Sequence, residues 1–280
     1  MIIPVTVIIA TLNEESRLAA CLGALRNFDE VIVVDSGSTD RTAEIAREHG
    51  ATLIDFRWNG QYPKKRQWCL DNLETRHEWI FFVDADEIVT AAVVGELSAL
   101  KFGCAGYFVK GRYIWNGKPL NHGLKNNKLA LINRRKFVFP VVNDLGLPGM
   151  GEMEGHYQPV LRYIYNNDGI GQLNAELDHD AAHSEDQWLA RHKRYAQWEA
   201  GMNLRKAWPK DPVKWRQALK ALFRRMPFRG EIAFLHTYIW KLGVLDGAGG
   251  LDFARKRAAY YRMIRSCSRQ SRNTSYPKAS

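Results

Sequence analysis

The sequence predicts an α/β fold, in which a mostly parallel, Rossmann-like sheet is flanked by helices and followed by a helical, basic C-terminal extension. Short apolar runs alternate with helical patterns up to residue 87, and helical patterns alone fill the chain from residue 184 onward. Charge divides the chain in the same way. Residues 181–280 contain 21 Lys and Arg against 7 Asp and Glu, whereas the preceding residues contain 19 against 23.

Length and composition indicate a globular protein. The 280 residues, 46% of them hydrophobic and 25% charged, are enough for one large domain with an appendage. The four cysteines form no CxxC pair, so we expect neither a zinc site nor a disulfide framework, and a reducing cytoplasm fits. The apolar start "MIIPVTVIIA" has no basic region before it and is expected to be a buried strand, not a signal peptide. No stretch approaches the ~18–20 apolar residues that cross a bilayer.

The alternation sets the expected order of elements. Parallel strands joined by helices are expected first, and the shorter runs of residues 104–165 then extend the sheet in a mixed or antiparallel manner. The resulting division is an α/β domain over 1–180, a basic helical region over 181–270 and a disordered tail over 271–280. The expected strands are 5–10, 30–35, 51–56, 79–83, 105–115, 128–139 and 158–165, and the expected helices are 14–28, 38–50, 63–73, 184–208, 211–226, 229–247 and 250–266.

Polar and acidic residues follow three of the expected parallel strands, as "TLNEE", "DSGSTD" and "DADE". Ligands of such sheets bind at the carboxyl ends of the strands, so these segments should converge on one cleft. Closely spaced carboxylates suit Mg²⁺ or Mn²⁺, and Asp84 and Asp86 can both face the cleft, one toward a sugar and the other toward a metal. The alternative is a turn at the end of a strand, with acids that cap the next helix.

The first strand is not followed by a glycine-rich phosphate loop. "TLNEES" stands where a dinucleotide fold has G-x-G-x-x-G, and a Walker lysine loop is missing as well. A bound phosphate must therefore be neutralised by a metal or by side chains. Lys64, Lys65 and Arg66 can supply that charge, although they also suit a solvated helix start.

Taken in order, "TLNEE", "VIVVDSGSTDRT", "PKKRQ" and "FFVDADE" resemble the N-terminal half of family 2 glycosyltransferases over roughly residues 3–100. The resemblance implies a GT-A fold and a nucleotide-activated sugar, with a divalent cation that compensates the clustered carboxylates. It also implies roles for individual residues. Thr11, Asn13 and Glu14 would line the nucleotide pocket, Asp35 would contact the base, Arg66 would approach the diphosphate, and Asp84 and Asp86 would form the metal-binding DxD motif.

The second half looks like small bacterial members that add one hexose to lipopolysaccharide core or another lipid-linked glycan, and it lacks the Q-x-x-R-W motif of processive synthases. Inversion at the anomeric carbon needs a carboxylate base on the acceptor side. We expect Glu154 to be that base, with Glu152 as the alternative and Asp144 as a weaker candidate. His179 is either a third metal ligand, as in some relatives, or a cap for the helix that begins near 184.

Lysines and arginines alternate with aromatic residues throughout the C-terminal third. This pattern suits core packing of most of the aromatics, with some left to contact an anionic membrane surface. Nucleic-acid binding is not expected, because no reader motif is present and the acidic cleft would repel it. The sequence thus predicts an inverting, metal-dependent glycosyltransferase that uses a nucleoside-diphosphate sugar, expected to be a UDP-sugar. It would act on a lipid-linked acceptor at the cytoplasmic face of a bacterial inner membrane. The alternatives are a sugar-nucleotide nucleotidyltransferase and a catalytically silent binding or scaffold protein.

Overall fold

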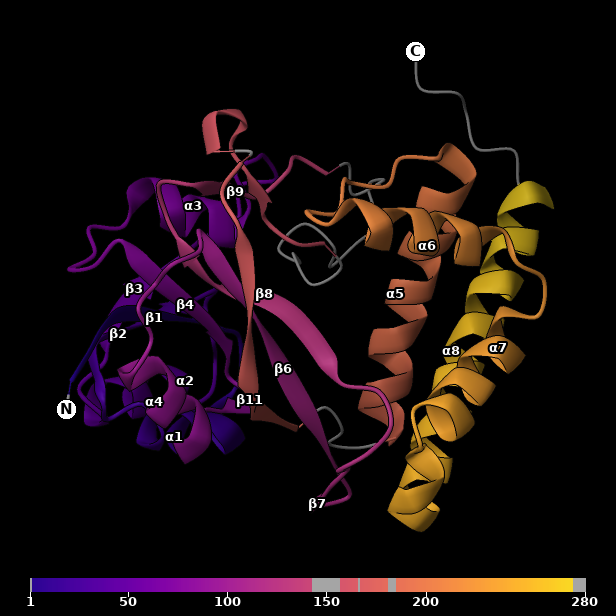
Figure 1. Ribbon diagram of the computed structural model, residues 1–280, viewed down its shortest axis with the longest axis horizontal. Coiled ribbons are helices and arrows are strands. Elements are labelled where there is room, and N and C mark those ends of the chain that lie inside the picture. Colours follow the sequence, from indigo (N-terminus) through magenta and orange to yellow (C-terminus); the bar gives the residue numbers. More distant parts are fainter. Residues whose placement is uncertain (1, 143–156, 166, 181–184, 274–280) are drawn as a thin grey trace. The chain divides into compact units, whose positions relative to one another are not determined.

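The computed structural model describes residues 2–142, 157–165, 167–180 and 185–273 (Figure 1). These residues divide into two compact units, each considered by itself. The first holds described residues of 1–114, 125–140 and 152–181, and the second holds described residues of 115–124, 141–151 and 182–280. The α/β architecture and the helical C-terminal region expected from the sequence are confirmed.

The first unit is built around one mixed sheet with the strand order β3-β2-β1-β4-β8-β6-β11-β5. Strands β1 to β4 run parallel, whereas β8 is antiparallel to both β4 and β6. Its elements are β1 (Ile3–Thr11), α1 (Glu15–Gly23), β2 (Phe28–Asp35), α2 (Thr42–Glu48), β3 (Thr52–Asp55), α3 (Lys65–Asn72), β4 (Trp79–Asp84), β5 (Glu87–Ile88), α4 (Ala91–Ser98), β6 (Gly106–Trp115), β8 (Asn126–Asn133), β9 (Phe137–Val138), β10 (Val160–Leu161), the 3₁₀ turn η1 (Tyr163–Tyr165) and β11 (Ile170–Asp180).

The strand order reverses between β1 and β4. The chain moves outward from β1 through β2 to β3 and then returns to the other side of β1 as β4. Because right-handed crossovers in opposite directions place their helices on opposite faces, α1 and α2 lie on one side of the sheet and α3 on the other (Figure 1). In open α/β sheets, ligands bind in a crevice at such a reversal, beyond the carboxyl ends of the strands. In this sheet that position is at the ends of β1 and β4, where Thr11 and Asp84 stand.

The core of this unit lies along β1 and β4. Both strands are apolar and rich in β-branched and aromatic residues, as suits strands that are covered on both faces. Val7, Ile9, Phe81 and Val83 are all at most 1% exposed. This buried base holds the strand ends, and with them the polar residues of the crevice, in fixed positions.

Some local expectations were wrong. Residues 158–165 form only the short strand β10 before η1, and Tyr163 and Ile164 are 88% and 78% exposed, so no buried face selects a longer strand. The helix expected over 38–50 begins later, at Thr42, whose backbone N–H donates to the Asp40 carboxylate at 3.0 Å. Gly50 does follow that helix with φ +73°, a left-handed conformation that favours glycine.

The second unit is mainly helical. Its small core includes Ala196, Ala200 and Ile264, where α5 packs on α8. The expected single helix over 229–247 is broken into three parts, with Leu242 left-handed at φ +59° before the last of them. The elements are β7 (Lys118–Pro119), α5 (Glu185–Arg205), α6 (Lys214–Arg225), α7 (Arg229–Leu235), the π-helix η2 (His236–Trp240), the 3₁₀ turn η3 (Gly243–Asp246) and α8 (Gly247–Asn273). Across the described residues, we find no helix with both the length and the apolar character to span a membrane.

Candidate active site at the switch point of the sheet

Thr11 and Asp35 are partners in the parallel register of β1 and β2, and their side chains meet beyond the strand ends. The Thr11 hydroxyl donates to Asp35 at 3.0 Å, and the Ser38 hydroxyl and backbone N–H donate to the same carboxylate at 2.5 and 2.8 Å. Burial alone would raise the pKa of Asp35, but these hydrogen bonds outweigh it and lower the pKa. Asp35 is therefore a fixed anion at the rim of the crevice.

Asn13 and Glu14 form the turn after β1. Asn13 has φ +54°, and its side-chain oxygen accepts a 2.8 Å hydrogen bond from the Thr39 backbone N–H. The Glu14 backbone N–H donates to the Thr42 hydroxyl at 2.7 Å, and its carboxylate pairs with Arg17. The turn after β1 is thus tied to the segment after β2, as expected for two loops that share one binding site.

Asp84 lies at the end of β4 between two cations. Arg66 Nη2 is 2.7 Å from one carboxylate oxygen, and Lys128 Nζ is 3.0 Å from the other. Burial would raise the pKa of Asp84, but the charges of Lys128 and Arg66 outweigh it and hold the pKa well below the usual range. Arg66 extends from the first turn of α3. Lys65 in the same turn and Lys64 at the N-cap are 7% and 2% exposed, so this segment is not a solvated helix start.

Lys128 links Asp84 to a second, fully buried carboxylate, that of Glu87. The lysine ammonium pairs with Glu87, whose other hydrogen bond comes from the Asp84 backbone N–H at 2.9 Å. Burial would lower the pKa of Lys128, but the charges of Asp84 and Glu87 raise it. The clustered carboxylates are therefore partly compensated by a lysine from the middle of the sheet, before any metal binds.

Asp86 is less well compensated than Asp84. Its nearest cationic groups are Arg17 Nη1 at 3.5 Å and His179 Nδ1 at 3.6 Å, both longer than a normal hydrogen bond. Burial, together with the negative charges of Asp84 and Glu87, raises the pKa of Asp86 even though His179 opposes it. Asp86 is the carboxylate of this cluster that would gain most from an added cation.

His179 reaches the cluster from β11. It stands opposite Glu87 in the antiparallel pairing of β11 with β5, and its Nδ1 is 3.6 Å from Glu87 Oε1. Burial would lower the pKa of His179, but the nearby carboxylates of Glu87 and Asp86 raise it. Neither this Nδ1 nor Glu87 Oε1 has a hydrogen-bond partner among the described residues. His179 lies within strand β11, near its end.

These residues fit a divalent cation only as part of a site. Among the described residues, no three His, Cys, Asp or Glu side chains form a ready-made metal site. Mg²⁺ and Mn²⁺ sites at nucleotides, however, are usually completed by phosphates and water around one or two carboxylates. Asp86, with the unsatisfied Nδ1 of His179 beside it, offers ligands of the required chemistry.

The structure brings most of the predicted site residues together at one edge of the sheet. These are Thr11, Asn13, Glu14, Asp35, Arg66, Asp84, Asp86 and His179. The candidate bases Glu154 and Glu152, and Asp144, lie outside the described residues. Sequence reasoning missed Lys128 and Arg17. A lone lysine in the otherwise apolar strand "KLALI" was the available signal for Lys128.

An α/β domain with paired aspartates at its switch point and no glycine-rich loop is typical of the glycosyltransferases that use nucleotide sugars. The comparison with protein families agrees, because residues 6–140 match the model described as glycosyl transferase family 2. Residues 6–140 of this chain therefore belong to glycosyl transferase family 2.

Individual relatives share this part of the chain. The lipopolysaccharide core biosynthesis glycosyltransferase LpsC of Rhizobium meliloti is 32% identical over 144 residues, which are 48% of this chain and 52% of LpsC. An uncharacterized glycosyltransferase of Rickettsia typhi is 35% identical over 97 residues, 33% of this chain and 31% of the relative. The chain thus spans about half or less of these relatives' lengths. Among solved structures, S. aureus TarS residues 1–349 give a TM-score of 0.49 at 17% identity, over 98% of this chain and 93% of that one.

Proposed function

We propose that this protein is an inverting glycosyltransferase that moves a sugar from a nucleoside-diphosphate sugar, a UDP-sugar in our proposal, to a lipopolysaccharide or other lipid-linked glycan acceptor. The observation that supports it most is the convergence of Asp35, Asp84 and Asp86 at the switch point, inside the segment that matches glycosyl transferase family 2. The name of LpsC, which concerns lipopolysaccharide core biosynthesis, supports the choice of acceptor.

The donor site follows from the charges in the crevice. Asp35 is a hydrogen-bond acceptor at the end of β2, beside the crevice. A nucleotide base and its ribose both carry N–H or O–H groups that can donate to such an acceptor. Arg66 is the cation best placed to turn from Asp84 toward a diphosphate, because its side chain is 19% exposed and its guanidinium lies over the face of Phe82. Lys128 and Glu87 keep Asp84 in position during such an exchange.

A divalent cation, held by Asp86 with Asp84 or His179, would neutralise the diphosphate as it leaves. The raised pKa of Asp86 and the unsatisfied His179 Nδ1 support this assignment. Glu154 is our proposed base for the acceptor hydroxyl. This assignment rests on the glycine-flanked position of Glu154 in the sequence, and Glu152 is the alternative base.

The experiment is a thermal-shift panel of nucleoside diphosphates and their sugars, with and without Mn²⁺. Asp86→Asn is compared with the wild type, and Glu74→Gln, which removes one exposed carboxylate, is the matched control. A ligand that binds the native state raises the melting temperature by mass action. We expect a Mn²⁺-dependent shift with one nucleotide, kept in Glu74→Gln and lost in Asp86→Asn. Equal shifts in all three proteins would contradict the metal assignment, and no shift with any nucleotide would contradict the donor site.

We also propose that the protein associates peripherally with the cytoplasmic face of the inner membrane. Trp215, Leu219 and Leu222 follow the helical spacing of α6 and are 66%, 56% and 54% exposed, and Met226, directly after the helix, is 36% exposed. Arginines and lysines flank this apolar stripe, as suits a helix lying on anionic lipid. Salt-sensitive flotation with anionic liposomes, weakened in Leu219→Ser and unchanged in Leu189→Ser on α5, is the expected result. Equal flotation of the two variants would show that the apolar stripe of α6 does not bind the membrane.

A further inference from the structure

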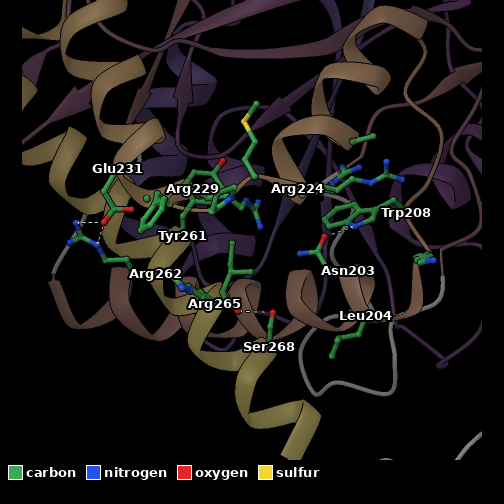
Figure 2. A pocket seen from close by; sticks show the side chains of 18 of the residues that line it. Asn203, Leu204, Trp208, Arg224, Arg229, Glu231, Tyr261, Arg262, Arg265 and Ser268 are labelled. Atoms are coloured by element: carbon green, nitrogen blue, oxygen red, sulfur yellow. Dashed lines mark hydrogen bonds and ion pairs between the residues drawn. The ribbon is translucent and has the colours of Figure 1, made fainter.

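The helical unit contains a second candidate binding site. Its residues are different from those of the acidic cluster, which is formed by Asp84, Asp86 and Glu87. The site is a pocket of about 860 Å³, lined by the end of α5, the segment 206–209, α6, the first turn of α7 and the second half of α8 (Figure 2). The labelled side chains that face it include Trp208, Arg224, Arg229 and Arg265. None of the donor-site residues contributes to it.

The lining is strongly cationic. Two of the cations have carboxylate partners, because Arg229 pairs with Glu199 at 2.5 Å and Arg262 pairs with Glu231 at 3.0 Å. Glu231 is the one acidic residue among the described lining residues. Within the described part of the chain, the other four lining cations have no carboxylate within 4.0 Å, and they are Lys206, Arg224, Arg225 and Arg265.

One of these unpaired cations is held rigidly. The Arg224 guanidinium lies 3.7 Å from the centre of the Trp208 ring, and Trp208 Nε1 in turn donates to Asn203 at 3.0 Å. Burial and the neighbouring charge of Arg229 lower the pKa of Arg224 even though the charge of Glu199 opposes them, so the site holds positive charge at a cost. Stacking fixes the plane of the guanidinium and leaves its N–H groups available for an anion.

The walls of the pocket also carry unusual backbone. Lys206 and Phe228, neither of them glycine, have φ +54° and +55°. At Gly230 an added Cβ would lie 2.9 Å from the Ala258 carbonyl oxygen, so α7 begins in close contact with α8. Strained residues and close backbone approach bring Arg229 on α7 and Arg265 on α8 to one pocket, and strain of this kind is common at binding sites.

We propose that this pocket binds a phosphate-bearing group, as an anion site in the helical unit that is additional to the donor site. A phosphomonoester or diphosphate accepts paired hydrogen bonds from guanidinium groups, and it carries more negative charge than a single carboxylate to offset several clustered cations. The phosphate can come from the headgroup of a phosphorylated lipid or from a soluble phosphorylated sugar. Both sources present the same chemistry to the arginines.

The test uses the full chain in EDTA, so that metal-dependent binding at the acidic cluster does not contribute. Calorimetry with inorganic pyrophosphate and with glucose 1-phosphate measures soluble ligands, and sedimentation with phosphatidylcholine vesicles, with and without phosphatidic acid, measures the lipid source. Arg224→Gln and Arg265→Gln are compared with Arg255→Gln, which removes the same charge from an exposed site on α8 outside the pocket. Unchanged melting curves establish that each variant is folded.

We expect saturable binding that weakens about tenfold in Arg224→Gln and in Arg265→Gln and is unchanged in Arg255→Gln. Binding of the soluble phosphates would support a soluble source, and binding only to phosphatidic acid vesicles would support a lipid headgroup. Equal weakening in all three variants would show that binding depends on overall positive charge and not on this pocket, and would overturn the proposal. The absence of binding to both the soluble phosphates and the vesicles would also overturn it. An oligonucleotide that binds more tightly than both, with the same dependence on Arg224, would overturn it in favour of nucleic acid.

Discussion

Lys128 Nζ lies 3.0 Å from the Asp84 carboxylate, although the two residues are 44 positions apart, and the same ammonium pairs with the buried Glu87. The lysine belongs to β8, which runs antiparallel beside β4. A resident cation in this position compensates Asp84 and Glu87 in the absence of a metal. The stability of the cluster and its proposed metal binding can therefore be tested separately.

Replacing Lys128 with methionine should destabilise the protein. The apolar side chain would fill similar space, but Glu87 and Asp84 would lose their shared cation, and removing one partner of a buried ion pair costs about 3–5 kcal/mol. Urea unfolding at pH 7 measures the loss. Lys101→Met, at an exposed position, is the control and should be close to neutral. Equal unfolding midpoints for the two variants would show that Lys128 does not stabilise the cluster.

Asp86→Asn should melt at a higher temperature than the wild type at pH 8 in the absence of metal. Burial and the charges of Asp84 and Glu87 raise the pKa of Asp86, so its ionised form costs stability at every pH above the unfolded value, and asparagine removes that cost. The same variant should lose metal-dependent ligand binding. Such a gain in stability with a loss of function is common at active sites. A lower melting temperature at pH 8 would mean that the Asp86 carboxylate is structural.

Asp35→Asn should lower stability, and the loss should depend on pH. Asparagine keeps one oxygen for the Gly37 and Ser38 N–H groups, but its NH2 group cannot accept from the Thr11 and Ser38 hydroxyls as Asp35 does, and losing buried hydrogen bonds in this way costs about 1–3 kcal/mol. The folded pKa of Asp35 is lowered, so its contribution is complete above the unfolded pKa of about 4 and is lost as the pH falls through the folded value.

The free energies of unfolding of the wild type and Asp35→Asn should therefore differ most at pH 6 and converge toward pH 3. Denaturant titrations at both pH values measure the difference, with Glu74→Gln as an exposed control. A gap that stays constant with pH would show that the Asp35 hydrogen bonds do not depend on its charge.

Gly250→Ala should destabilise the helical unit. An added Cβ would lie 1.9 Å from the Gly243 carbonyl oxygen, which is closer than atoms can approach, so the start of α8 would have to move at a cost of ~3 kcal/mol. Gly95→Ala on α4 is the matched control. Its Cβ would meet nothing within 4 Å, and alanine should stabilise that helix by up to about 1 kcal/mol. Thermal melting of both variants checks the contrast, and similar losses in the two would refute the packing at Gly250.

The sequence by itself determined the local features of this protein. The apolar runs of β1 and β4 predict buried strands, and parallel pairing then brings Thr11 beside Asp35 and places Asp84 at the same edge. These relationships follow because the carboxyl ends of parallel strands meet at one edge of a sheet, independently of how the rest of the chain folds. The basic and helical character of the C-terminal third could also be predicted from the sequence, since charge and helical spacing are local properties.

The tertiary structure alone decided which distant residues complete each site. Lys128 reaches Asp84 because β8 inserts beside β4, and His179 reaches Asp86 because β11 pairs with β5. The cationic pocket likewise depends on how α7 meets α8 at Gly230. Strand order and helix contacts arise from the packing of the whole core, and no short stretch of sequence contains the register that brings these charges together.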